Sequence, residues 1–104
     1  METDRTILPM APMQAEPRHA EAFKALSHLT RLNIFFYLVK KGAVGDSVGN
    51  IQAVVHVPGP TLSHHLDILQ RAGLLNARRE ERFIFYSVQR ENVTDMIRLL
   101  TACC

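Results

Sequence analysis

Cysteine is nearly absent from this 104-residue chain, whose only two, Cys103 and Cys104, are adjacent and end the sequence. Neighbouring cysteines close no useful loop and would be strained as a disulfide, so a disulfide-stapled fold is excluded. No basic segment followed by an apolar run opens the chain, and no stretch approaches about 18 uninterrupted apolar residues. We therefore expect no secretory leader and no membrane span, and a cytoplasmic protein whose thiols stay reduced.

The chain also lacks a large excess of either charge, because its formal net charge is only +2. A weakly basic balance is compatible with nucleic acid and does not identify it. Apolar residues make up 47% and charged residues 21% of the chain, which is typical of one globular domain. Prolines without helical periodicity, Pro9 and Pro12 among them, predict a flexible N-terminal arm over residues 1–16. The folded domain is predicted over residues 17–104.

Helical periodicity begins at Pro17, which suits a first turn. A second helix is predicted from residues 27–30 to Gly42, with Leu32, Phe35, Phe36 and Val39 on its buried side. Asp46 or Ser47 then caps a short helix. Pro58-Gly59-Pro60 breaks that helix, and the next one runs from Pro60 to Gly73. A last helix is expected over residues 90–104, with Val93, Met96, Ile97 and Leu100 on one face.

Between the last two helices the period changes from 3.6 to 2. The segment "LLNARREERFIFYSV" alternates and is rich in Phe, Tyr, Ile and Val in its second half, which predicts a two-stranded hairpin with its tip near Glu80 and Glu81. Two short helices joined by a tight turn and followed by a hairpin are typical of a winged helix-turn-helix. The predicted fold is mainly α with a small β-hairpin.

The helix "TLSHHLDILQR" carries the candidate base-reading residues. Its leucines, Leu62, Leu66 and Leu69, share one side and face the core. The opposite side is polar near the helix N-terminus, where a recognition helix meets bases and phosphates. Its outward residues are His64, Asp67 and Arg71, with Thr61 and Ser63 at the margins. His65 lies beside the leucines and is predicted to pack, and adjacent helical histidines diverge too far for a zinc site.

The hairpin carries Arg78, Arg79 and Arg82. Two interpretations are open: a wing that contacts the phosphate backbone or minor groove, or a solvated tip whose charge Glu80 and Glu81 partly cancel. A recognition helix beside the hairpin favours the wing.

These motifs together resemble the arsenical-repressor (ArsR/SmtB) family of bacterial winged-helix repressors. The similarity runs from about Phe23 to the C-terminus and is strongest in "KALSHLTRLNIFFYL", "PTLSHHLDILQRAGLL" and "RREERFIFYSV". It implies a homodimer formed through the first and last helices. It also implies two recognition helices on a pseudo-palindromic operator, and an inducer that releases the DNA. The DNA-binding residues implied are Thr61, Ser63, His64, Arg71, Arg78, Arg79 and Arg82.

The departures from that family concern mainly the metal ligands. Where many relatives have Cys-X-Cys at the start of the third helix, this chain has Ser47 and Gly49. Others bind zinc between the last helices through Asp and His, but here Asp95 is followed two residues later by Ile97. At the hairpin tip Glu81 replaces the usual glycine, so the turn type is open.

Any sensing chemistry then falls to Cys103 and Cys104, because some relatives carry such a pair just past the last helix and capture trivalent arsenic or antimony with it. Adjacent soft thiolates can chelate one thiophilic atom. Arsenite prefers three thiolates, whereas methylarsenite needs two. Other interpretations stay open: small apolar residues that finish the dimer face, a redox or persulfide switch, or a prenylation signal.

Three functional classes compete on this sequence. The first is an inducible DNA-binding repressor with a metalloid inducer and no required cofactor. The second is a winged-helix module for protein contacts. The third is an enzyme using the terminal thiols, which the missing Cys-X-X-Cys spacing and general base argue against. We expect the repressor and no enzyme; the inducer, the operator and a further cysteine beyond Cys104 are not determined by the sequence.

Overall fold

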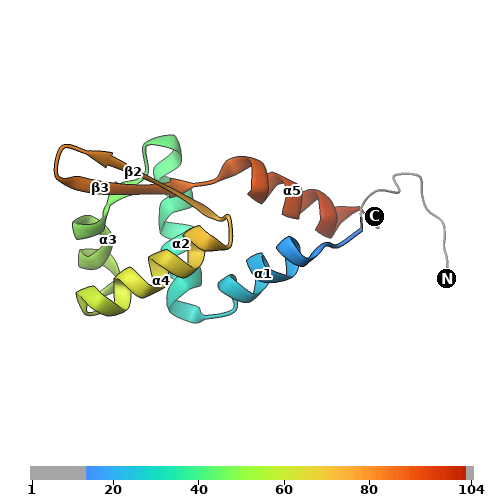
Figure 1. The fold of residues 1–104 in the computed structure, drawn as a ribbon, viewed down its shortest axis with the longest axis horizontal. Helices are drawn as coiled ribbons and strands as arrows, with labels where there is room; N and C mark the ends of the chain where they lie inside the picture. The colour runs from blue at the N-terminus through green and yellow to red at the C-terminus, as the bar shows by residue number, and fades with distance from the viewer. Residues whose placement is uncertain (1–13, 103–104) are drawn as a thin grey trace.

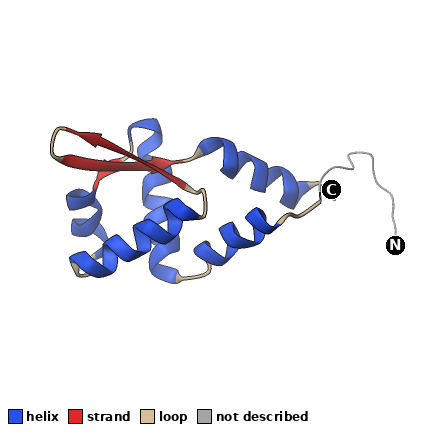
Figure 2. Ribbon diagram, in the orientation of Figure 1, coloured by secondary structure: helices blue, strands red, loops and turns tan. Residues whose placement is uncertain are grey.

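The computed structural model describes residues 14–102. Figure 2 shows a mainly helical domain with one β-hairpin, which confirms the predicted fold class. The expectations for the arm before residue 14 and for Cys103 and Cys104 lie outside the described residues. In chain order the elements are α1 (Pro17–Leu26), α2 (Leu29–Lys41), the short 3-10 helix η1 (Gly42–Val44), β1 (Asp46–Ser47), α3 (Val48–Val55), α4 (Gly59–Arg71), β2 (Leu75–Glu80), β3 (Phe83–Val88) and α5 (Arg90–Thr101).

The helix-turn-helix consists of α3 and α4. The Ser47 side chain caps α3 by accepting the Asn50 N–H at 3.2 Å, which decides between the two caps that were predicted, Asp46 and Ser47. Pro60 lies in the first turn of α4. At the other end Gly73 has a φ of 82°, and the Leu74 N–H donates to the Leu69 carbonyl at 3.0 Å. This is the glycine-terminated Schellman ending, which fixes where α4 stops.

The core lies between α2, α3 and α4. Leu62, Leu66 and Leu69 of α4 are buried, as predicted. The prediction for α2 was wrong in part, because Phe36 and Val39 are 54% and 48% exposed. The side chains that α2 buries are Ile34, Phe35 and Leu38.

The structure confirms the predicted hairpin of β2 and β3, and β1, which was not predicted, extends it to a three-stranded antiparallel sheet in the order β1-β3-β2. Gly45 allows β1 to approach β3, since a Cβ there would lie 1.9 Å from the Tyr86 carbonyl oxygen. Glu81 and Arg82 connect β2 to β3. Glu81 has a φ of 57°, so it occupies the left-handed conformation that the absent glycine would adopt at less cost.

The elements separate into two ends (Figure 1). The hairpin tip, α3 and the start of α4 gather at the left, whereas α1 and α5 extend to the right. At the right end, Arg18 and His19 of α1 both bind Asp95 of α5, each at 2.7 Å. Within residues 14–102, no helix is long and apolar enough to cross a membrane.

Candidate nucleic-acid interface

The first two turns of α4 present the polar face that the sequence predicted. Thr61, Ser63 and His64 are all exposed. His65 is only 6% exposed, which confirms the prediction that the second histidine packs and the first faces outward. The hydroxyl and imidazole groups on this exposed face of α4 can form hydrogen bonds with base edges and phosphates.

The start of α4 is also electropositive. The first intrahelical bond runs from the Leu62 N–H to the Pro58 carbonyl, so the N–H groups of Gly59 and Thr61 precede it. Within the described chain no side chain caps this end, and the first turn of α4 carries no acidic residue. Free N–H groups and the positive end of the helix dipole favour a phosphate here.

The turn between α3 and α4 is held by a residue that the sequence analysis missed. The Gln52 side-chain amide donates to the Val57 carbonyl at 3.0 Å, which ties α3 to the segment that leads into α4. Only the contact reveals this role, because a half-buried glutamine on a short helix gives no signal in the sequence.

The hairpin register separates two neighbouring arginines. Arg79 pairs with Ile84, Ala77 with Tyr86, and successive residues of a strand point to opposite faces. Arg79 shares its face of β2 with Leu75, which is 2% exposed and lies in the same core cluster as Leu66 and Leu69, so this is the face toward α4. On that face burial raises the pKa of Tyr86, and the Asp67 carboxylate of α4 raises it further. Arg78 therefore lies on the face away from α4.

Contacts within the protein occupy Arg78. Its Nη1 donates to the Val44 carbonyl at 2.8 Å, and its Nε pairs with Glu80 at 2.8 Å. The guanidinium also lies 4.8 Å from the centre of the Phe85 ring. Arg78 thus braces the hairpin against η1, and these contacts compete with the DNA-binding role the sequence analysis gave it.

The other candidate arginines are exposed. Arg79 and Arg82 form no ion pair with any carboxylate of residues 14–102. Arg82 lies at the hairpin turn, 5.5 Å from the centre of the Phe83 ring. Arg71, near the end of α4, pairs with Asp67 at 3.0 Å, but with 80% of its side chain exposed this pair adds little and can open.

Buried His65 lies in a positively charged neighbourhood. Its ring centre is 4.6 Å from that of His28, and the Arg31 Nη1 lies 3.4 Å from its Nδ1. Burial lowers the pKa of His65, and the charges of His28, Arg31 and His64 lower it further. The neutral form of His65 is consequently favoured on the buried side of the recognition helix.

Ser47 and Asp95, two positions at which the resemblance implied metal ligands in other proteins, have other roles here. Ser47 caps α3, and Asp95 accepts hydrogen bonds from Arg18 and His19. The Glu16 N–H donates to His19 Nδ1 at 2.8 Å, so Nε2 is the protonated nitrogen that donates to Asp95. These bonds hold the pKa of Asp95 below its usual value, the larger effect coming from His19. Across residues 14–102, no three His, Cys, Asp or Glu side chains gather as a metal site.

Comparisons with known proteins agree with this architecture. A family model described as a helix-turn-helix domain matches residues 26–78. The uncharacterized HTH-type transcriptional regulator MJ1325 of Methanocaldococcus jannaschii is 38% identical over 88 residues, which cover 85% of this chain and 97% of that protein. A cadmium resistance transcriptional regulatory protein, a CadC homolog of Staphylococcus aureus, is 32% identical over 78 residues, covering 75% of this chain and 63% of that one.

Among solved structures, this chain is similar to the homodimeric winged helix-turn-helix DNA-binding domain of Mb0332 from Mycobacterium bovis, a possible ArsR-family regulator. The TM-score is 0.68 and the identity 28%, over 83% of this chain and 77% of that one. The relatives are transcriptional regulators and not enzymes, and one of them is named for cadmium resistance. The chain belongs to the ArsR/SmtB family of winged helix-turn-helix, DNA-binding transcriptional regulators.

Proposed function

We propose that this protein is a bacterial repressor, acting in the cytoplasm, that binds an operator and leaves it when a trivalent arsenical binds. The observation that supports operator binding best is the exposed polar start of α4, with Thr61, Ser63 and His64, beside a hairpin face that presents Arg79. In this assignment α4 enters the major groove. Arg79 and Arg82 contact the backbone from the hairpin, and Arg71 from the end of α4.

The repressor acts as a homodimer through α1 and α5. Two large apolar side chains of α5, Ile97 and Leu100, are 55% and 61% exposed in the single chain, which suits a face covered by a second copy. The homodimeric state of the Mb0332 domain supports a dimer. Two recognition helices then meet half-sites one helical turn apart, about 34–36 Å.

Selection of duplexes from a random pool by the purified protein tests operator binding. The proposal expects an enriched pseudo-palindrome, and an affinity that falls steeply with salt as phosphate contacts release counterions. The result against it is no enriched sequence together with a flat salt response. Gel filtration with and without duplex then tests the alternative of a protein-contact module.

The inducer site that we propose is the pair Cys103 and Cys104. Its support is chemical: two soft thiolates on adjacent residues can chelate one arsenic or antimony atom. Arsenite and antimonite would take a third ligand from the partner subunit, a small thiol or hydroxide. Methylarsenite already carries one carbon and needs only the two sulfurs.

Release would follow from a change in packing at the end of α5. Binding there alters how α5 meets its dimer mate, and with it the separation of the two recognition helices. A coupling of about 1–3 kcal/mol, usual for allostery, lowers operator affinity by roughly five- to 150-fold.

Cysteine variants test this assignment. Cys103→Ser and Cys104→Ser should each bind the enriched duplex normally and lose release by arsenite, methylarsenite and antimonite, with zinc as a negative control. Normal release from both variants contradicts the thiol site and leaves the repressor intact. Release by a persulfide donor or oxidant alone, reversed by a reductant, assigns the pair to redox sensing instead.

A further inference from the structure

The recognition helix has two different flanks. Asp67 lies on one side of α4, close enough to the hairpin for its carboxylate to raise the pKa of Tyr86 of β3. Ile68 and Ala72 lie on the other side, where α4 meets the corner between α1 and α2. A helix in the major groove, which is about 12 Å wide, runs between two phosphate backbones. The hairpin arginines can account for only one of them.

An open cleft lies on the flank away from the hairpin. Its volume is about 360 Å³, and α1, α2 and α4 each supply part of its wall. Three of its lining residues are cations, namely Lys24, Arg31 and Arg71, against one carboxylate, Glu21. The cleft therefore carries a surplus of positive charge beside the helix that contacts DNA.

Arg31 is the most informative of these cations, because it is half-buried and its contacts are uncharged. Its Nε donates to the Ala25 carbonyl at 2.7 Å, and its Nη1 lies 3.4 Å from His65 Nδ1. No carboxylate in residues 14–102 lies within ion-pair distance of it. A guanidinium has five N–H donors, so several remain for an anion. Withdrawing an uncompensated charge from water is costly, and an anion in the cleft offsets that cost.

The neighbouring groups are suited to a phosphate oxygen. Lys24 is exposed and offers a mobile point charge, whereas the arginines offer planar forks that match phosphate geometry. The ion pair that Arg71 makes with Asp67 is exposed and weak, so Arg71 can turn toward a new anion.

We propose that Lys24, Arg31 and Arg71 form a second backbone contact, which holds a DNA phosphate on the flank of α4 opposite the hairpin. This inference rests on the proposed operator binding and extends it to a defined phosphate site. It gives the protein one contact on each side of the major groove, and it adds α1 and α2 to the DNA-binding surface. The contact is independent of base sequence.

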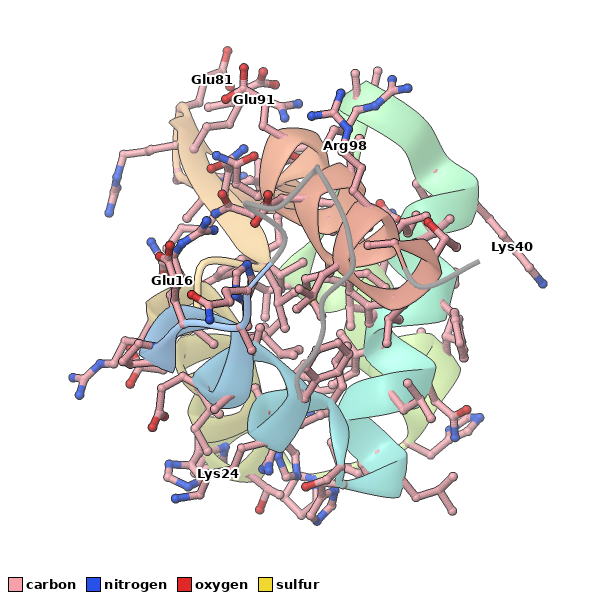
Figure 3. All side chains as sticks on the ribbon, turned by 90° about the vertical axis from the view of Figure 1, so that its right-hand side faces the viewer. Glu16, Lys24, Lys40, Glu81, Glu91 and Arg98 are labelled. Atoms are coloured by element: carbon pink, nitrogen blue, oxygen red, sulfur yellow. The ribbon has the colours of Figure 1, made fainter. Side chains whose placement is uncertain are left out.

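Lys24 provides the test, because Arg31 also holds the Ala25 carbonyl and its loss would disturb the fold. Lys40 of α2 is a matched control: it is exposed too, and Figure 3 shows it at the opposite side of the molecule from Lys24. Lys24→Gln and Lys40→Gln remove the same charge. The full chain is titrated by fluorescence anisotropy with a random-sequence duplex of about 30 base pairs, roughly three turns, over a range of KCl concentrations.

Lys24→Gln should lower the slope of log affinity against log salt by about 0.9, the value for one phosphate contact, and weaken binding to random and enriched duplexes equally. Lys40→Gln should leave the slope unchanged, and Arg71→Gln should behave like Lys24→Gln. Equal slopes for Lys24→Gln, Lys40→Gln and the parent chain overturn the second contact. If Arg79→Gln still lowers the slope, the proposed operator binding survives; if no variant of either flank changes it, operator binding fails too.

A second arm separates DNA phosphate from a free anion. Inorganic phosphate replaces chloride at constant ionic strength, and the Arg31 Nε resonance is followed by NMR without DNA. We expect no saturable shift at millimolar phosphate. A saturable shift that Lys24→Gln abolishes would assign the cleft to a free phosphorylated ligand and overturn the assignment to DNA.

Discussion

Arg78 and Arg79 are adjacent in sequence, yet the structure gives them opposite tasks, and a pair of substitutions separates these tasks. Arg78→Gln removes the hydrogen bond to the Val44 carbonyl, the pair with Glu80 and the stacking on Phe85. Arg79→Gln removes an exposed guanidinium on the face toward α4. The first change should destabilise the hairpin, and the second should weaken DNA binding.

The contacts set the expected magnitudes. A hydrogen bond from a charged donor contributes about 1.5–3 kcal/mol, and a partly exposed cation–π contact about 0.5–1 kcal/mol. The Arg78 side chain is 37% exposed, so its pair with Glu80 adds little. We expect a loss of about 2 kcal/mol, which for a domain of this size lowers Tm by roughly 10 °C. Arg79→Gln should change stability by less than about 0.5 kcal/mol.

Two assays on the same samples distinguish the structural role of Arg78 from the DNA-binding role of Arg79. Thermal unfolding at one protein concentration gives Tm, and anisotropy titrations at a temperature where both variants are folded give the salt slope. Arg79→Gln should lower the slope by about 0.9 while its Tm stays that of the parent chain. The reasoning is refuted if Arg79→Gln melts early, or if Arg78→Gln keeps the parent Tm and loses the phosphate contact.

Three further changes test the fold. Glu81→Gly should raise the free energy of unfolding, measured by urea titration, by up to about 1 kcal/mol, because Glu81 has a φ of 57° in an exposed turn. A lower free energy of unfolding would show that the Glu81 side chain contributes more than the backbone strain costs. Leu66→Ala should cost about 2–5 kcal/mol, because Leu66 is 1% exposed, and a cost below about 1 kcal/mol would contradict its place in the core. Stability should also fall as pH drops below about 6.5, because the pKa of His65 is lowered in the folded chain and the unfolded chain binds the proton first. For this one group the slope is at most about 1.4 kcal/mol per pH unit, and urea titrations of His65→Asn should show a flatter profile between pH 7 and pH 5; an unchanged profile would exclude His65 as the cause.

The sequence predicted most of the element order, because residues with strong local preferences mark the ends. Pro17 and Pro60 start helices, Gly42 and Gly73 end them, and the change of period marks the hairpin. The buried side of α2 was harder to predict, since the helix is apolar on several sides and its period does not distinguish Phe36 from Ile34. Only the neighbours that pack against it make Ile34 the buried one.

For the candidate site, the sequence predicted which face of α4 is exposed, but not the contacts of the individual arginines. Ser63, His64 and His65 follow from the leucine spacing of α4, and their exposure agrees with it. The difference between Arg78 and Arg79 could not be predicted, because it depends on the pairing register of β2 and β3 and on the approach of Val44. The cleft at Lys24 and Arg31 joins residues of three helices that no local pattern connects.

The central claim is that the exposed start of α4 selects the DNA sequence. The most direct measurement is the ratio of affinities for the enriched duplex and the random duplex, in the parent chain and in the double variant Ser63→Ala/His64→Ala. Both residues are exposed, so the variant should keep the parent Tm. We predict that the affinity ratio of the double variant falls toward one. Its slope of log affinity against log salt should differ from the parent slope by no more than about 0.9, the value for one phosphate contact. An unchanged ratio at full stability would contradict the claim.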